Sequence, residues 1–392
     1  MEVYRAVDAR SVNLPSCVIA PGEEWKRIEE ELARTGLCLP FRHRLSWAVA
    51  DTAKGHRLIG TRDPSGQLLG AMALEVNKSR VMPGQVELRV RRFSEGLRPE
   101  AMEPLISEAV RIARRDWRVL RLVIEVFSRG RRSDVREILA NHGFIQSMQP
   151  RSYRSTLTLD LAGSEETIFG GLHKTARENL KLASRTGLAV RPLTQAEYAG
   201  PISQLHHDAM ERTGGKASRT DWRSILELSR NHPEHSRIVG VFTHQGHKPE
   251  DLTGFAWGCI DGDHGTYAAA GTSRTPGSNL PFSYPLVWDL ILWSKRKGAQ
   301  WFDLGGVTQG NSATDPLAGI SRFKRYFSRC EEEVGEEWYL EPRPILAGMA
   351  AIMRHTVHGL HGKFSAHPHA LVPHTPASTY GPTNSPANPE AA

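Results

Sequence analysis

Apolar and polar positions alternate with two different periods along this chain, and the order of the two periods repeats. Three strand-like segments with a period of two come first, at residues 56–60, 68–75 and 86–90. A helix at 99–117, a strand at 119–126 and a second helix at 134–142 follow them. A similar scheme returns at residues 237–243, 253–260, 267–273, 283–297 and 301–304. This order predicts two α/β (α+β) domains of the same architecture, each with a mixed sheet flanked by helices.

Composition and chain order set the expected domain boundaries. The first domain is expected at residues 1–158 and the second at residues 159–343. Residues 344–358 predict a terminal helix that packs back on the body, because the apolar run at 345–353 is too short to cross a bilayer. From 359 to 392, Pro, His, Ser, Thr and Ala dominate, which is typical of a disordered tail.

The helix predicted over residues 317–327 contains one anomaly. Four apolar residues share one face at about 100° per residue: Leu317, Ile320, Phe323 and Phe327. Lys324 falls inside the same apolar arc. Such a lysine either extends its ammonium to solvent along its stem or holds a desolvated charge against a partner, which is the arrangement that makes lysines functional.

An ordered series of motifs surrounds this helix. The series consists of the short strand 301–304, Gly305-Gly306, Arg322-Phe-Lys-Arg-Tyr-Phe327, Val334-Gly-Glu and the aromatic strand 338–340. It resembles the C-terminal half of the Fem family, nonribosomal peptidyltransferases that build peptidoglycan bridges from aminoacyl-tRNA. Residues 173–190, a basic helix running into a strand, resemble the start of that family's second domain. The resemblance implies two tandem acetyltransferase-like (GNAT) domains.

The resemblance also implies a reaction, the transfer of an amino acid from aminoacyl-tRNA to an amine acceptor with formation of an amide bond. Residues 193–236 are too short, and too broken by Gly214-Gly215 and Pro233, to form the coiled-coil arm of the members that add later bridge residues. The acceptor is therefore expected to be a peptidoglycan precursor peptide, or a small molecule or peptide natural product. The ester donor is already activated, so neither a covalent intermediate nor a bound cofactor is expected.

The resemblance places the chemistry at Lys324, where a buried cation would stabilise the oxyanion that develops on the carbonyl. Asp303 is a candidate general base, although an aspartate before two glycines is equally a turn former. Deprotonation assisted by the tRNA itself would make a protein base unnecessary. The candidates for substrate binding are Phe323, Arg325, Tyr267, Tyr284, Trp257, Trp47, Gly305 and Gly306.

The charge balance permits a polyanionic partner. The chain has 50 Lys and Arg against 43 Asp and Glu, a net charge of +7. One predicted helix carries a basic stripe with spacings of three, four and four, formed by Lys174, Arg177, Lys181 and Arg185. Such a stripe is often only a solvated helix face; the functional interpretation is contact with the tRNA backbone. No DNA-reading motif accompanies it, so no DNA partner is expected.

Two alternatives keep the same fold. Arg274-Thr-Pro-Gly277-Ser-Asn279 nearly matches the Arg/Gln-x-x-Gly-x-Gly/Ala loop that holds acyl-CoA pyrophosphate on helix N–H groups, with Asn279 in place of Gly or Ala. This loop makes an acyl-CoA-dependent GNAT N-acyltransferase the first alternative. The second is a GNAT-like scaffold without activity that binds RNA or another protein, and Lys324 argues against it.

Metal and membrane chemistry find little support in the sequence. The four cysteines, at positions 17, 38, 259 and 330, lack metal-ligand spacing, and the histidines of the tail lack carboxylate or cysteine partners, so no metal site is expected. The chain has no run of eighteen apolar residues and no signal-peptide pattern. We therefore expect no transmembrane segment and a cytoplasmic location.

Overall fold

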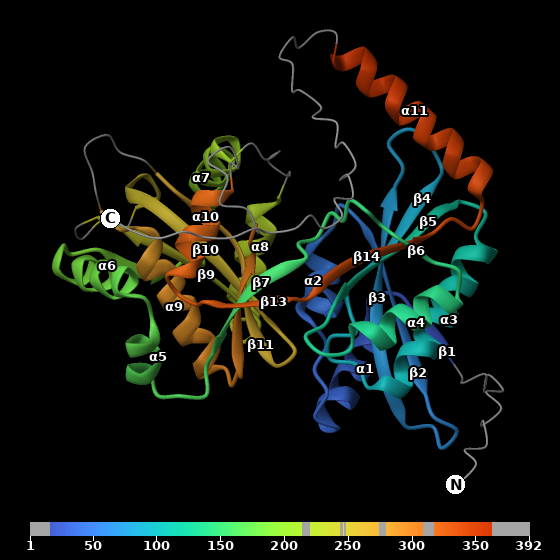
Figure 1. Ribbon diagram of the computed structural model, residues 1–392, viewed down its shortest axis with the longest axis horizontal. Helices are drawn as coiled ribbons and strands as arrows, with labels where there is room; N and C mark the ends of the chain where they lie inside the picture. The colour runs from blue at the N-terminus through green and yellow to red at the C-terminus, as the bar shows by residue number, and fades with distance from the viewer. Residues whose placement is uncertain are drawn as a thin grey trace, which may run out of the picture. The chain divides into compact units, whose positions relative to one another are not determined.

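The computed structural model describes residues 16–213, 220–243, 246, 248–273, 280–308 and 317–362. The chain divides into two units, residues 1–347 and 348–392. The first unit contains two mixed sheets of seven strands, each with helices packed against it (Figure 1). The predicted fold class, two α/β domains with mixed sheets flanked by helices, is confirmed.

The first sheet has the strand order β1-β2-β3-β4-β5-β14-β6. Its strands are β1 (Ser16–Ile19), β2 (Gly55–Arg62), β3 (Leu68–Lys78), β4 (Val86–Phe93), β5 (Val119–Phe127), β6 (Ile145–Gln146) and β14 (Gly335–Leu340). β4 and β5 run parallel, and the other neighbouring strands run antiparallel. The helices of this half are α1 (Glu23–Arg34), α2 (Leu45–Ala50), α3 (Pro99–Arg115) and α4 (Arg132–Asn141), with the 3-10 turn η1 (Phe41–His43) before α2.

Helix α3 shows how the sequence pattern positions a helix on this sheet. Pro99 occupies its first turn, where the missing N–H is not needed. Leu105, Ile106 and Ala109 are fully buried in the same core as the strand residue Leu122. The spacing of these apolar residues therefore forms one continuous face against β2, β3 and β5.

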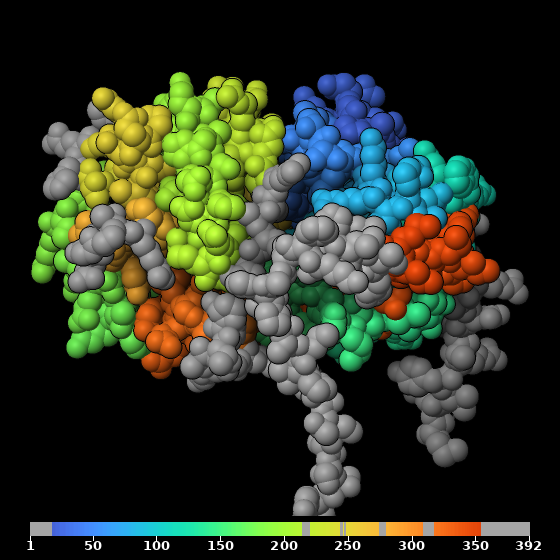
Figure 2. Space-filling view, turned by 90° about the horizontal axis from the view of Figure 1, so that it is seen from above, coloured from blue at the N-terminus to red at the C-terminus, as the bar shows by residue number. Residues whose placement is uncertain are grey.

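The second sheet has the order β13-β7-β12-β11-β10-β9-β8. Its strands are β7 (Ser155–Asp160), β8 (Ala189–Pro192), β9 (Ser236–Phe242), β10 (Leu252–Asp261), β11 (His264–Thr272), β12 (Trp301–Gly306) and β13 (Cys330–Glu333). Its helices are α5 (Glu165–Gly171), α6 (Lys174–Arg185), α7 (Ala199–Arg212), α8 (Trp222–Asn231), α9 (Ser283–Arg296) and α10 (Ala318–Arg325), with the 3-10 turns η2 (Ala196–Tyr198) and η3 (Pro249–Asp251). Here β11 and β12 are the parallel pair. α7 packs on β11 and forms part of the molecular surface (Figure 2).

The last strand of each half is exchanged between the two sheets. When the second order is reversed, the two strand orders correspond position by position, and β14 occupies in the first sheet the place of β7 in the second. β7 follows the first half in the chain but pairs with β12 and β13, whereas β14 follows the second half but pairs with β5 and β6. Trp338 of β14 is buried in the core of the first half. β14 thus belongs to the first sheet although it lies after residue 158, the expected boundary between the domains. That boundary was placed from chain order alone.

The C-terminal helix α11 (Pro344–Gly362) extends past the expected range of 344–358. The two units meet within this helix, so its packing back on the body stays a prediction. Residues 363–392, most of the tail expected at 359–392, lie outside the described residues. Within the described part of the chain, no helix is both long and apolar enough to cross a membrane.

Candidate active site

The two parallel strands of the second sheet separate at their carboxyl ends. β11 and β12 pair over residues 264–266 and 301–303. Beyond that point β11 continues along β10 to Thr272, and β12 continues along β7 to Gly306. The corresponding strands β4 and β5 of the first sheet stay paired almost to their ends. Ligands of open α/β sheets bind outside the carboxyl ends of the strands, so the point where β11 and β12 separate is the candidate active site.

Lys324 of α10 lies between the ends of these two strands. Its Nζ donates a hydrogen bond to the Gly306 carbonyl at 2.7 Å, and it lies 6.0 Å from the centroid of the Tyr267 ring. The residue is only 7% exposed. Burial lowers the pKa of Lys324 to about 8, against the opposing effect of the Asp303 carboxylate. Lys324 is therefore a desolvated ammonium that is protonated at neutral pH and titrates just above it.

The two glycines at the end of β12, Gly305 and Gly306, lie close to other parts of the chain, where a larger residue would have little room. Gly305 has a φ of 76°, in the left-handed region that favours glycine. A Cβ atom at Gly305 would lie 3.3 Å from Lys324 Nζ and 3.4 Å from the Tyr267 carbonyl oxygen. A Cβ atom at Gly306 would lie 2.5 Å from the Cβ of Tyr153, which is a clash. Gly305 therefore leaves space for the lysine, and Gly306 leaves space for the tyrosine.

Asp303 is fully buried, and both of its carboxylate oxygens accept hydrogen bonds. Oδ2 accepts from the Tyr153 hydroxyl at 2.7 Å, and Oδ1 accepts from the Gly305 N–H at 2.8 Å and from the Thr156 hydroxyl. Arg92 Nη1 lies 3.5 Å from Oδ2. These donors hold the carboxylate in a fixed position. The geometry thus favours an electrostatic role for Asp303, and the general-base role stays a prediction.

The buried face of α10 differs from the predicted apolar face. Lys324 is buried, as one of the two sequence-based interpretations requires, but Leu317 and Ile320 are 41% and 39% exposed. The helix instead buries Ser321, whose hydroxyl oxygen accepts from the Thr308 N–H at 3.1 Å. A polar contact to the chain after β12, rather than the apolar arc alone, therefore sets the rotation of this helix.

The aromatic candidates fall into two groups. Tyr284 of α9 packs edge-on against Phe323 at 5.1 Å between ring centroids, on the helix that carries Lys324. Trp47 and Trp257 stack on each other at 6.2 Å in a separate buried cluster. The structure therefore groups Tyr267, Tyr284 and Phe323 with the lysine and separates both tryptophans from it. A substrate-binding role for Trp47 and Trp257 stays a prediction.

The polar candidates have different surroundings. The Arg325 guanidinium donates to the Thr308 carbonyl at 3.0 Å and pairs with Glu331 at 3.3 Å, so it braces the end of α10. Within the basic stripe, Arg177 donates to the Gly170 and Leu172 carbonyls and holds the turn between α5 and α6.

The other three residues of the basic stripe, Lys174, Lys181 and Arg185, lie on the surface of α6. The Lys174 side chain is 77% exposed and lies 3.7 Å from Glu178. Lys181 lines a groove of about 510 Å³ between α6 and α9, and Arg185 is exposed in the last turn of α6. Arg274, Gly277 and Asn279, the loop of the alternative acyl-CoA reaction, lie outside the described residues.

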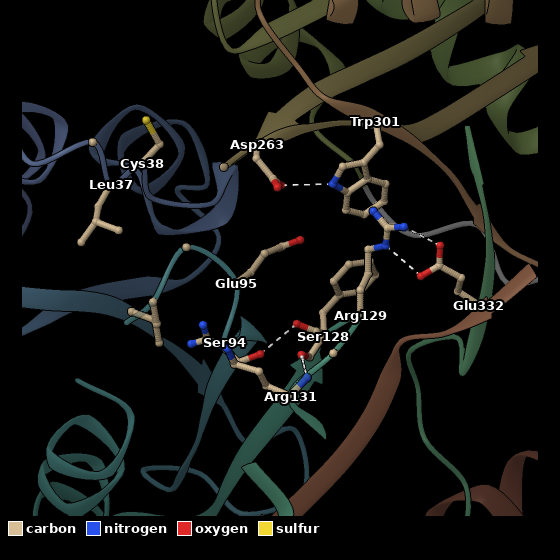
Figure 3. Close-up of a pocket in the computed structure, with 16 residues that line it drawn as sticks. Leu37, Cys38, Ser94, Glu95, Ser128, Arg129, Arg131, Asp263, Trp301 and Glu332 are labelled. Carbon is tan, nitrogen blue, oxygen red and sulfur yellow. Dashed lines mark hydrogen bonds and ion pairs between the residues drawn. The ribbon is translucent and has the colours of Figure 1, made fainter. Parts of the chain in front are cut away.

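A separate cavity of about 690 Å³ lies at the carboxyl ends of β4 and β5. Figure 3 shows two contacts of its charged residues: Trp301 donates to Asp263 at 3.3 Å, and Arg129 donates to Glu332 at 2.8 Å. Glu95 lines the same cavity. The residues that line it do not include Lys324. Among the described residues, no group of three or more His, Cys, Asp or Glu could hold a metal ion.

Two residues near Asp303 were missed from the sequence, Arg92 and Tyr153. A signal existed for Arg92: it follows Arg89 and Arg91 in one strand, and arginines in the interior of a sheet require acidic partners. Tyr153 has no local signal, because only the exchange of β7 into the second sheet brings it to Asp303.

The comparisons with known proteins concern the fold. No family model matches the chain, and no curated protein sequence matches it. Among solved structures, FemX aligns with a TM-score of 0.69 at 13% identity, over 86% of this chain and 100% of that chain. The structure of L-PGS from Bacillus licheniformis aligns with a TM-score of 0.50 at 12% identity, over 86% and 97%. A tandem GNAT protein from the clavulanic acid biosynthesis pathway aligns with a TM-score of 0.47 at 16% identity, over 84% and 98%. The alignment with FemX confirms the predicted Fem-like fold with its two mixed sheets.

Proposed function

We propose that this chain, which has the fold of FemX, is an acyltransferase that moves an amino acid from aminoacyl-tRNA to an amine acceptor. The observation that carries the proposal is the buried Lys324 ammonium on the Gly306 carbonyl, between the separated ends of β11 and β12. The resemblance of the surrounding motifs to the Fem family supports the choice of donor. The acceptor is a peptidoglycan precursor peptide, or a small molecule or peptide natural product.

In the proposed reaction the ammonium of Lys324 stabilises developing negative charge. An ammonium has three N–H donors, and one of them is used by the Gly306 carbonyl. The other two can donate to the ester carbonyl oxygen as the acceptor amine attacks and the oxyanion forms. The new C–N bond remains when the C–O bond to the tRNA breaks, and the tRNA hydroxyl leaves with the proton that the amine loses. No covalent enzyme intermediate is required.

In this proposal, basic side chains on the protein surface bind the phosphates of the tRNA donor, without contacts that recognise particular bases. Lys174 is exposed on α6, and Lys181 and Arg185 follow it along the same helix. Lysines and arginines on one face bind phosphates without sequence preference. Use of aminoacyl-tRNA as the donor would place the reaction in the cytoplasm.

A donor assay tests this proposal. Labelled mixed aminoacyl-tRNAs, and in parallel labelled acetyl-CoA, are offered to the purified protein with a panel of amine acceptors, with and without RNase. We expect incorporation of an amino acid that RNase abolishes. Label that arrives only from the thioester would instead identify an acyl-CoA-dependent N-acyltransferase, and no transfer from either donor would favour a binding scaffold.

A further inference from the structure

An arginine of the first sheet reaches the carboxylate beside Lys324. Arg92 stands at the end of β4, and its Nη1 lies 3.5 Å from Asp303 Oδ2 on β12. The same nitrogen lies 3.3 Å from the hydroxyl of Tyr153, which itself donates to Asp303 Oδ2 at 2.7 Å. Arg92, Tyr153 and Asp303 thus form a closed triangle of polar contacts between the two sheets.

The backbone at Arg92 has an uncommon conformation. Its φ is 49°, and Ser94 has a φ of 80°, both in the left-handed region that residues other than glycine seldom adopt. The pairing of β4 with β5 shifts at this point, between Val90 and Phe93, as in a bulge. Such strained positions persist only where the surroundings determine them, and they are concentrated at functional sites.

The Arg92 side chain is held by contacts with an aromatic ring and with several polar groups. Its guanidinium carbon lies 3.6 Å from the centroid of the Phe127 ring, and its Nη2 donates to Glu95 at 2.9 Å. The titratable groups that face Arg92 or Lys324 are Glu95 after β4, Tyr153 before β7, Cys259 and Asp261 on β10, His264 and Tyr267 on β11, and Asp303 on β12. Asp303 is the group that Arg92 shares with Lys324.

We infer that Arg92 is a positioning residue for the reaction at Lys324, an inference that rests on the proposed function. The Arg92 guanidinium contacts the buried Asp303 carboxylate, and the charge of the same carboxylate acts on the Lys324 ammonium. Arg92 and Tyr153 fix the Asp303 carboxylate and offset part of its charge. The lysine therefore donates to the Gly306 carbonyl instead of forming a direct ion pair with Asp303. Its other two N–H groups can then donate to the substrate.

The charge of Lys324 can be measured without any substrate. The pH dependence of its reaction with a small amine-specific reagent, followed by mass spectrometry, reports its pKa, and the exposed Lys174 serves as the internal reference. Arg92→Gln should raise the pKa of Lys324 by about one unit, because the lysine then interacts with more of the Asp303 charge. Arg92→Lys keeps the charge and should stay close to the wild-type value. Asp303→Asn should lower the pKa, because it removes the stabilising carboxylate.

A double variant tests whether Arg92 acts through Asp303. In the Asp303→Asn background, Arg92→Gln should no longer raise the pKa of Lys324. An unchanged pKa in Arg92→Gln, or the same rise in the double variant, would overturn the inference. If circular dichroism shows that Arg92→Gln does not fold, Tyr153→Phe replaces it: loss of the hydroxyl should also raise the pKa, and no change would overturn the inference.

The proposed function and this inference can fail separately. The alkaline limb of kcat/KM should move with the labelled pKa in each variant, which a purely structural role of Arg92 would not produce. If the labelling shows the expected shifts while the wild type transfers no amino acid from tRNA, the coupling of Arg92 to Lys324 stands and the proposed function is refuted. If transfer occurs but neither the labelled pKa nor the alkaline limb moves, the proposed function stands and the role of Arg92 is refuted.

Discussion

Replacement of Lys324 by methionine removes the proposed oxyanion donor and keeps most of the side-chain volume. In other acyl-transfer enzymes the loss of one oxyanion donor lowers kcat by about 10²–10³-fold, or about 2.7–4 kcal/mol of transition-state stabilisation. The charged donor here is desolvated, which strengthens its interaction with an oxyanion. We therefore expect Lys324→Met to lower the rate of aminoacyl transfer by at least about 100-fold.

The same change should have little effect on stability. The pKa of Lys324 is lowered from an ordinary 10.5 to about 8, so burial of the charge costs about 3 kcal/mol at neutral pH, and methionine removes that cost. Methionine also loses the hydrogen bond to the Gly306 carbonyl, which contributes about 1.5–3 kcal/mol for a charged donor. The two effects nearly cancel, so the Tm should stay within a few degrees of the wild type.

Lys295→Met is the matched control. Lys295 is partly buried and, like Lys324, donates to a backbone carbonyl, that of Leu161, at 2.9 Å, but it lies near the end of α9. The assay is single-turnover transfer of a labelled amino acid to the acceptor, with thermal unfolding measured on the same preparations. A decrease of less than tenfold in Lys324→Met, or an equal decrease in both variants, would refute the catalytic role of this lysine.

Four further predictions follow from the contacts described above. The transfer rate should fall above about pH 8, because deprotonation removes the charge of Lys324; a flat kcat/KM profile from pH 6 to 10 would contradict this, and Lys324→Met should lack the alkaline limb. Gly305→Ala should lower the transfer rate by about tenfold or more and change the reactivity of Lys324, because the position has a φ of 76° and a Cβ there lies 3.3 Å from Nζ; unchanged labelling of the lysine would count against it. Lys174→Ala with Lys181→Ala should weaken tRNA binding and reduce its salt dependence by about two in log–log slope, measured by filter binding at several salt concentrations; unchanged affinity would mean that the stripe is only a solvated face. Trp338→Ala should destabilise the protein by about 3–5 kcal/mol in urea unfolding, because the exchanged strand β14 anchors in the first core through this side chain; a loss below about 1 kcal/mol would show that β14 contributes little to that core.

The sequence by itself was sufficient for the main helices and strands and for the anomaly at Lys324. Periodicity places α3, α9 and β12 close to their observed positions, because the pattern of apolar residues along one helix or strand is a local property. Lys324 stands out for the same reason, since a charge inside an apolar arc is visible without a partner. The two glycines after Asp303 are also visible, although their reasons differ: one makes room for Lys324 and the other for Tyr153.

Only the tertiary structure decides what surrounds Lys324. The exchange of β7 into the second sheet brings Tyr153 to the Asp303 carboxylate, which Arg92 of the first sheet also reaches, and no local pattern encodes a contact between positions 92 and 303. For the same reason the sequence could not separate Trp47 and Trp257 from the site, because every buried aromatic residue has the same local pattern whichever core it joins. The sequence thus indicates most of the buried positions and which residues could react. The pairing of strands across the two sheets determines which of them meet.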